Sequence, residues 1–319
     1  MNLEFVSDFD IRISYLRMLR LMRYPHLYFI ISALFLIPGI FSLVRWGLQP
    51  SIDFTGGSIL ETKIESHQQP QPQAGPPLAE ATSHQLEEII ENENVDLSSI
   101  QTSGDNTFIL RMKEINEEKK NQILAKIKEE IGETEELRFE TIGPTLGAEL
   151  LRKTLIALVL AVLFILSYVT YQFKDKKYGI CAILAVFHDT LIVLGTFSLL
   201  GHFVGVEVDT LFVTAVLTIL SFSIHDTVVV YDRIRESIKK YPKAAFESLA
   251  DKAVLETLAR SVNNSMTIIF MLLSLWLLGG ETIRWFVLAL LVGSISGTYS
   301  STFTAVPLLV VWERFKKRK

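Results

Sequence analysis

Two aspartates inside long apolar stretches are the residues of this chain whose type and position could support chemistry. Asp226 lies in an apolar run that begins near Leu211, and Asp189 follows His188 in another. An ionised carboxylate near the centre of a bilayer costs at least about 2.5 kcal/mol, so such a residue usually faces a bundle interior or a water-filled path. The chemistry that a buried carboxyl group could perform there is the binding and release of a proton.

A third aspartate, Asp232, is expected closer to the membrane surface. Arg233 and Arg235 follow it where the apolar run ends, which favours a carboxylate that reaches the polar interface. Asp226 lies about 9 Å deeper on the same helix, too far for its short side chain to reach that interface. Asp189 lies about 15 Å from the start of its helix and is therefore predicted near the bilayer midplane.

The surrounding segments indicate a polytopic α-helical membrane protein. Hydrophobic residues make up 49% of the 319 residues. Six segments approach or exceed the roughly 20 apolar residues that cross a hydrocarbon core. They are residues 27–46, 154–173, 179–203, 210–231, 262–278 and 285–312.

Charged residues are distributed unevenly, and this predicts the orientation. Residues 51–150 contain 20 Asp or Glu against 8 Lys or Arg, whereas both ends of the chain and the connections after the second and fourth segments are basic. Basic connections stay on the cytoplasmic side of a membrane. We therefore expect both termini in the cytoplasm and the acidic residues outside.

The acidic segment has the pattern of a small α/β domain. Strands at 58–65, 98–103, 107–112 and 136–142 and helices at 79–93 and 115–131 give the order β-α-β-β-α-β, which is typical of a ferredoxin-like fold. Residues 68–77, rich in Gln and Pro, are predicted to form a linker or long loop. Because Cys181 is the only cysteine, this domain must fold without an internal disulfide.

The expected organisation has five parts. They are a cytoplasmic segment (1–26), a first transmembrane helix (27–46), a periplasmic α/β domain (47–153), transmembrane helices two to six with a cytoplasmic loop at 233–260 (154–312), and a basic cytoplasmic tail (313–319). The paired glycines Gly56 and Gly57 predict a tight reversal with positive φ where the outer domain begins.

Two other segments have a predicted packing role. Residues 243–259 are amphipathic, and docking on the membrane or a partner is as well supported as packing on this chain. Gly293 and Gly297 form a small-residue face, for which we favour contact within the chain over a dimer. Pro307 predicts a kink in the last helix.

Other chemistries are not indicated. The sequence has no motif for a metal ion or a catalytic nucleophile, and its glycine-rich spots lack the context of a phosphate-binding loop. We therefore expect no enzyme activity, no cofactor, no metal ion and no nucleic-acid partner. An ion gradient remains as the energy source, since one charge moved across 100 mV is worth about 2.3 kcal/mol.

Several motifs, in order along nearly the whole chain, point to one family. They are Ile52-Asp53-Phe54-Thr55-Gly56-Gly57, Gly143-Pro144-Thr145-Leu146-Gly147, His188-Asp189, the run from Asp226-Thr227 through Tyr231-Asp232-Arg233 to Glu236, and Gly297-Thr298-Tyr299-Ser300-Ser301. In these motifs the chain resembles the SecF family, whose members are subunits of the bacterial SecD–SecF protein-export complex. That family is related to proton-driven resistance–nodulation–division transporters.

The resemblance implies a location, partners and residue roles. The implied protein is a six-helix subunit in the bacterial cytoplasmic (inner) membrane, surrounded by membrane lipid. It would associate with SecD and use proton influx to assist an unfolded preprotein through the SecY channel after the ATPase SecA has acted. Asp226 and Arg260 become proton-path candidates, followed by Asp189. The remaining motif residues are expected to be structural: Asp53, Phe54, Thr55, Gly56, Gly57, Gly143, Pro144, Gly147, Asp232, Arg233 and Gly297.

The sequence departs from the family pattern at three places. Ser51 replaces a glycine, Asn264 replaces a threonine, and His225 precedes Asp226 where the family has asparagine. A histidine titrates near neutral pH, so His225 is a further candidate for the proton carrier. As the cation that pairs with Asp226, Arg260 has a rival in Arg233, about 10.5 Å further along the helix of Asp226.

Two competing functions remain open at this point. A stand-alone proton-coupled exporter of small molecules or lipids usually has twelve helices and two large external domains, a count that a homodimer would restore. A structural scaffold would use its buried polar residues only to hold helices together.

Overall fold

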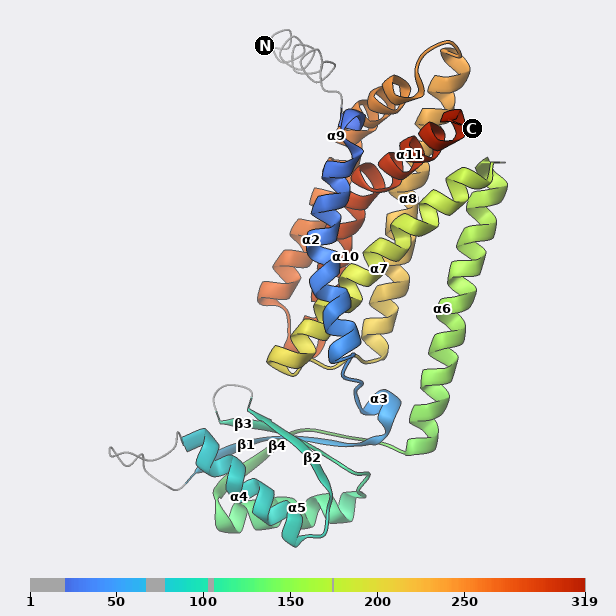
Figure 1. Ribbon diagram of the computed structural model, residues 1–319. Helices are drawn as coiled ribbons and strands as arrows, with labels where there is room; N and C mark the ends of the chain where they lie inside the picture. Colours follow the sequence, from blue (N-terminus) through green and yellow to red (C-terminus); the bar gives the residue numbers. More distant parts are fainter. Residues whose placement is uncertain (1–20, 67–77, 103–105, 174, 319) are drawn as a thin grey trace, which may run out of the picture. The chain divides into compact units, whose positions relative to one another are not determined.

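The computed structural model describes residues 21–66, 78–102, 106–173 and 175–318 (Figure 1). The described chain forms two compact units, one of residues 50–156 and one of the other helices. The Gln- and Pro-rich segment 68–77 lies outside the described residues.

The helical unit confirms a multi-pass membrane protein. Six candidate spans in the described chain are long and apolar enough to cross a membrane. They are α2 (Pro25–Arg45), α6 (Pro144–Phe173), α7 (Lys176–Val204), α8 (Thr210–Lys240), α9 (Phe246–Leu278) and the pair α10 (Glu281–Phe303) and α11 (Ala305–Arg318). A 3-10 turn, η1 (Leu21–Arg23), precedes α2.

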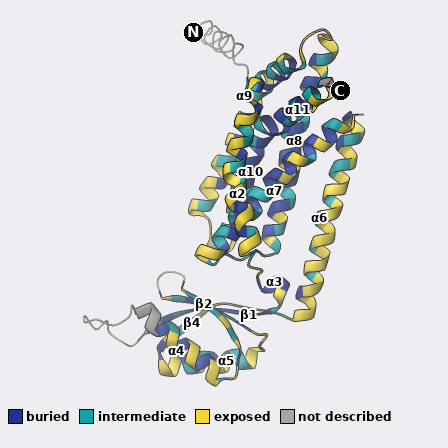
Figure 2. Ribbon diagram, viewed as in Figure 1, coloured by how far each residue is buried: buried dark blue, intermediate teal, exposed yellow. Residues whose placement is uncertain are grey.

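The helices differ in how much of their surface this chain covers. Figure 2 shows α7 largely buried and α6 exposed along most of its length. Val169 and Phe173, in the last turns of α6, are buried in the core, whereas Leu158 and Ile165 are only partly buried against it. The exposed apolar side chains of α6 therefore face lipid or another chain.

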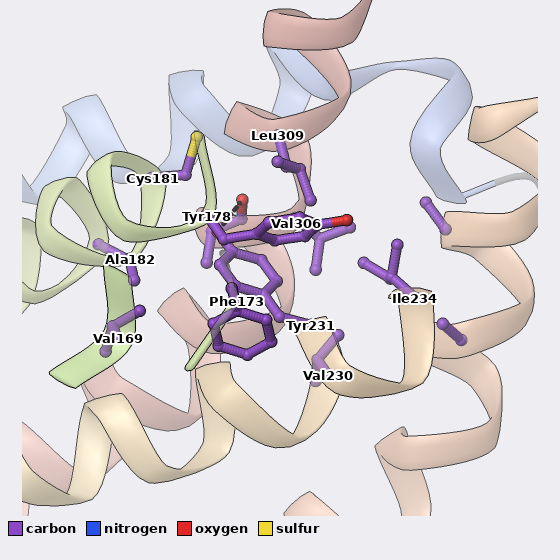
Figure 3. Close-up of a cluster of buried hydrophobic side chains, with 14 of the residues drawn as sticks. Val169, Phe173, Tyr178, Cys181, Ala182, Val230, Tyr231, Ile234, Val306 and Leu309 are labelled. Carbon is purple, nitrogen blue, oxygen red and sulfur yellow. Dashed lines mark hydrogen bonds between the residues drawn. The ribbon is translucent and has the colours of Figure 1, made fainter. Parts of the chain in front are cut away.

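An aromatic cluster fixes the C-terminal end of α6 against α7 and α8 (Figure 3). The ring centroid of Tyr178 lies 5.2 Å from that of Phe173 and 5.3 Å from that of Tyr231. The centroids of Phe173 and Tyr231 lie 6.0 Å apart. Tyr231 is fully buried and donates its hydroxyl to the carbonyl of Ala305, at 2.9 Å. Such ring pairs contribute about 0.5–1.5 kcal/mol beyond their buried area, so this cluster also anchors the start of α11 to α8.

The amphipathic segment 243–259 was expected in the cytoplasmic connection 233–260, outside the fifth span. It continues into the fifth span as the single helix α9, because residues 246–278 contain no glycine or proline that would end it. Its apolar face, with Leu249, Ala250, Ala253 and Val254, is buried in the unit. This finding supports packing within the chain for that face.

The last span is divided, as Pro307 predicted. α10 ends at Phe303, four residues before Pro307, and α11 starts at Ala305. A proline ring clashes with the carbonyl four residues earlier, which accounts for the position of the break. The packing predicted for Gly293 is also confirmed, because a Cβ there would lie 2.3 Å from the side chain of Ile219 on α8.

α2 and α7 cross at two glycines that the sequence did not single out. A Cβ built on Gly195 would lie 2.5 Å from the Cα of Gly39. Next to this crossing, the hydroxyls of Ser42 and Ser198 lie 2.7 Å apart, and Ser198 donates to the carbonyl of Gly47 at 2.6 Å. The two helices can therefore approach closely only because neither glycine has a side chain.

Residues 50–156 contain the predicted α/β domain. The strands β1 (Gly57–Ser66), β2 (Leu97–Thr102), β3 (Thr107–Met112) and β4 (Gly132–Ile142) and the helices α4 (Leu78–Asn92) and α5 (Glu117–Glu130) follow in the expected order. The sheet is antiparallel with strand order β2-β3-β1-β4, which confirms the ferredoxin-like arrangement. Its core includes Leu60, Leu110, Leu86 and Ile123.

The two glycine motifs of this unit meet each other. A short helix that was not predicted, α3 (Ile52–Thr55), leads into Gly56 and Gly57, whose φ angles are 74° and 130° as the sequence predicted. A Cβ on Gly147 would lie 2.9 Å from the amide nitrogen of Gly56. The start of β1 is thus packed directly on the first turns of α6.

Glu93 links the two helices of this unit and makes its stability dependent on pH. Lys119 and Lys126 each lie 2.5 Å from its carboxylate. The hydrogen bond from Lys119, followed by that from Lys126, lowers the pKa of Glu93 to about 2. A carboxyl group whose folded pKa is lowered stabilises the fold above its unfolded pKa, and this contribution is lost as the pH falls through about 2.

We expect Glu93→Gln to destabilise residues 50–156 at neutral pH. The difference in unfolding free energy between the variant and the wild type should shrink as the pH falls from above about 4.5 towards 2. Urea unfolding of this unit at several pH values measures it. Glu91→Gln, at an exposed position, is the matched control. A difference for Glu93→Gln that stays constant from pH 7 to pH 2 would contradict the assignment.

Candidate proton site

Polar residues lie well inside three helices that pack together. Asp189 is 13 residues from the start of α7, Asp226 is 16 from the start of α8, and Ser296 is 15 from the start of α10. These positions are roughly 20–24 Å along each helix. Asp189 and Asp226 lie 15 and 14 residues before the ends of α7 and α8, and Ser296 lies seven before the end of α10. Each polar group therefore lies in a part of its helix that the hydrocarbon core of a membrane would surround.

Asp189 is fully buried and accepts hydrogen bonds at both oxygens. Ser296 donates to Oδ1 at 2.6 Å, and Nδ1 of His188 lies 3.1 Å from the same oxygen. Ser223 donates to Oδ2 at 2.6 Å and Ser300 at 2.5 Å. The carboxylate thereby joins α7 to both α8 and α10.

Asp226 is half-buried beside a small cavity between α8, α9 and α10. The cavity has a volume of about 30 Å³. Its polar lining includes Ser223, Asp226, Asn264, Ser265, Ser294 and Thr298. A site needs roughly 10–15 Å³ to hold one water and about 300–1,000 Å³ to hold a drug-sized ligand. This space fits one or two water molecules.

Two neighbouring groups act electrostatically on Asp226. They are His225 on the same helix and Arg260 on α9. The rival cation, Arg233, is engaged elsewhere, with Glu256 at 2.6 Å and Glu236 at 2.5 Å. In the described part of the chain, Arg260 is therefore the arginine that remains to balance Asp226.

The structure brings Asp226, His225 and Arg260 together. Asp189 does not line the cavity itself, and Ser223, which does, donates a hydrogen bond to it. Asp232 lies apart on the exposed side of α8. Gly297 lines the cavity, and a Cβ on it would lie 3.8 Å from Oδ2 of Asp189. The residues of the two glycine motifs belong to the other unit, apart from this cluster.

Three serines of this region were missed by sequence reasoning. Ser223, Ser296 and Ser300 are the hydroxyl donors of Asp189. A usable signal was present, because Ser296 and Ser300 are four residues apart and so share one helix face, and Ser223 precedes Asp226 by three. Among the described residues, no three His, Cys, Asp or Glu side chains are placed to share a metal ion.

Known proteins resemble the chain along most of its length. A family model described as "Protein export membrane protein SecD/SecF, C-terminal" matches residues 122–315. The protein translocase subunit SecF of Thermobaculum terrenum is 41% identical over 302 residues, which cover 93% of this chain and 94% of that protein. The SecF of Anaerolinea thermophila is 38% identical with the same coverage.

Solved structures agree with these relatives. The crystal structure of SecDF, a translocon-associated membrane protein from Thermus thermophilus, matches with a TM-score of 0.78 and 30% identity over 92% of this chain. A SecDF structure in a super-membrane-facing form matches with a TM-score of 0.63. This chain covers 38% of the solved SecDF chain in each case. It belongs to the SecF family of protein-export membrane proteins.

Proposed function

We propose that this chain is an accessory subunit of the Sec protein translocase and couples proton influx to protein export across the cytoplasmic membrane. Its relatives are named as translocase subunits. The observation that carries the coupling is Asp226, half-buried at mid-span beside a cavity of water size and acted on by Arg260. A carboxyl group that water can reach inside a membrane can bind and release protons.

A partner chain completes this site. His225, Arg260, Asn263 and Asn264 are exposed on the isolated chain, although they lie in or next to the apolar spans. An arginine at the centre of a lipid-facing helix costs at least about 2.5–3.5 kcal/mol. We assign the covering partner as SecD, since more than half of the solved SecDF chain lies outside the part that this chain matches. The SecY channel and a translocating preprotein follow as further partners.

The proposed cycle uses the charge of Asp226. When it is ionised, its attraction to Arg260 holds α8 and α9 together at the cavity. A proton arriving from the periplasmic side removes that attraction, the helices shift, and residues 50–156 move with them. Release of the proton to the cytoplasm restores the first state. A potential of 100 mV supplies about 2.3 kcal/mol for each proton.

The direction of proton flow follows from the proposed orientation. Lys176 and Lys177 start α7, Lys239 and Lys240 end α8, and Lys316 lies near the end of α11. These basic helix ends belong in the cytoplasm by the positive-inside rule, together with both termini. Residues 50–156 are then periplasmic, and protons enter from their side.

Export of small molecules is not favoured, because the cavity beside Asp226 is about 30 Å³, a tenth or less of a typical small-molecule site. In a stand-alone exporter, the exposed polar side chains around Arg260 would also face lipid unless a second chain covered them.

Membrane vesicles that contain the purified complex and the Sec channel test the proposal. We expect SecD to copurify with this chain, and a proton gradient directed inward from the side of residues 50–156 to accelerate completion of preprotein export. Reversing the gradient is the control and should give no acceleration. Acceleration in both directions would contradict the orientation, and none in either direction would contradict the coupling.

A further inference from the structure

Asp189 has the contacts of an ionised carboxylate. Each of its oxygens has two hydrogen-bond partners: Ser296 and His188 at Oδ1, and Ser223 and Ser300 at Oδ2. An ionised carboxylate offers about four acceptor sites, whereas a protonated one must use one oxygen as a donor. With all four sites filled, adding a proton would displace one of these donors.

His188 fits the same charge state. An ionised carboxylate accepts only, so Nδ1 of His188 must carry the hydrogen that points to it. Nε2 of His188 is buried and has no hydrogen-bond partner among the described residues. A neutral ring leaves a lone pair at that nitrogen, whereas a cationic ring would bury an N–H without an acceptor, which costs more. The pair is therefore a neutral histidine that donates to a charged aspartate.

Ser223 connects this carboxylate to the cavity of Asp226. Its hydroxyl donates to Asp189 at 2.6 Å, and the residue also lines the cavity. Gly297 lies over the contact, with its Cβ position 3.4 Å from the Cβ of Ser223 and 3.8 Å from Oδ2 of Asp189. Because the Ser223 hydrogen is committed to Asp189, the oxygen presents only lone pairs to the cavity. A water bound there would donate to Ser223 instead of accepting from it.

We propose that Asp189 is a positioning residue for the proton site: an ionised carboxylate that fixes Ser223 as a hydrogen-bond acceptor in the wall of the Asp226 cavity. This inference rests on the proposed function, since it assigns the exchanging proton to Asp226. Asp189 is fully buried and does not line the cavity, so it acts on the cavity through Ser223. The same bonds hold α8 and α10 against α7 beside the cavity.

The other titratable groups that face Asp189 and its contacts are few. His188 is on α7 itself, and Asp226 lies on α8 on the far side of Ser223. Tyr299 on α10 has its ring 6.4 Å from that of His188, and its hydroxyl donates to the carbonyl of Tyr28 on α2. No lysine or arginine of the described residues pairs with Asp189, so three hydroxyl donors and the ring N–H of His188 offset its charge.

Infrared difference spectroscopy of the purified complex as a function of pH tests this without an export assay. The carboxyl signal that disappears in Asp226→Asn is assigned to Asp226. We expect Ser223→Ala to shift its titration midpoint by up to about 1 pH unit, the equivalent of one hydrogen bond. Ser296→Ala also removes a hydrogen-bond donor from Asp189, but one that does not line the cavity. It should therefore shift the titration midpoint of Asp226 less.

A double-mutant cycle separates positioning from direct charge effects. Asp189→Asn should shift the Asp226 midpoint less in a Ser223→Ala background than in the wild type, and by an unchanged amount in a Ser296→Ala background. Equal shifts in all three backgrounds would overturn the proposal. So would a second titrating carboxyl signal that vanishes in Asp189→Asn. Both results are independent of whether export responds to the proton gradient. They would therefore contradict the role of Asp189 without contradicting the proposed function.

Discussion

Replacing Asp226 by asparagine is expected to abolish the acceleration of export by a proton gradient while leaving the translocase complex assembled. Asparagine has nearly the shape of aspartate and keeps hydrogen bonding at the cavity, but it cannot release a proton. The fixed neutral side chain also lacks the attraction to Arg260 that acts on Asp226. The variant should therefore remain in the state that protonation produces.

The measurement compares export with the gradient intact and after an ionophore has collapsed it. For Asp226→Asn the two rates should become equal, at the collapsed-gradient rate of the wild type. Asp232→Asn is the matched control, because it is the same substitution six residues along α8 at an exposed position. The control should keep a wild-type ratio of the two rates.

Two results would change the assignment. A full gradient response in Asp226→Asn would change the assigned proton carrier to His225, which also lines the cavity, or to Asp189. Loss of the complex itself, seen as failure of SecD to copurify, would favour a scaffold in which the polar residues only hold helices together.

The spans and the order of the α/β domain could be predicted because each depends on neighbours in sequence. An apolar run of about 20 residues or an alternating strand is complete within one segment. The break at Thr304 was predictable for the same reason, since Pro307 acts on a carbonyl four residues away. The continuity of α9 was missed because the charges at 247–260 resemble a surface helix, and only tertiary packing shows that its apolar face is covered.

The partners of Asp189 could not be predicted, because they come from distant parts of the chain. Ser223, Ser296 and Ser300 lie 34, 107 and 111 residues away. A serine or threonine in a membrane helix can also donate to the carbonyl four residues before it, as Thr190 and Thr214 do here. The sequence alone does not distinguish hydroxyls that bond locally from those that bond across helices.

The crossing of α2 and α7 predicts the largest effect on stability. In Gly195→Ala the new methyl group would lie 2.5 Å from Cα of Gly39 and 3.0 Å from its carbonyl carbon. These are backbone atoms, so the clash is relieved only if one helix moves. That movement would strain the hydrogen bond between Ser42 and Ser198, which lies beside the crossing. Overpacking of this kind costs roughly 1–3 kcal/mol.

Gly297→Ala provides the matched control for this prediction. It makes the same substitution inside a helix, but the new Cβ would lie no closer than 3.4 Å to another atom, an ordinary contact. Alanine favours a helix over glycine by about 1 kcal/mol, so this variant should be as stable as the wild type or more stable. Gly195→Ala has the same intrinsic gain and should nevertheless unfold at a lower temperature.

Thermal unfolding of the purified proteins in detergent, followed by circular dichroism, compares the two variants. The two variants should change the unfolding temperature in opposite directions. The gain in helix propensity is common to both, so the contact with Gly39 accounts for the difference. If Gly195→Ala unfolded at or above the temperature of Gly297→Ala, α2 and α7 could not be held at glycine contact distance. The hydrogen bonds that join Ser198 to Ser42 and to Gly47 would then not be what holds α2 to the rest of the helices.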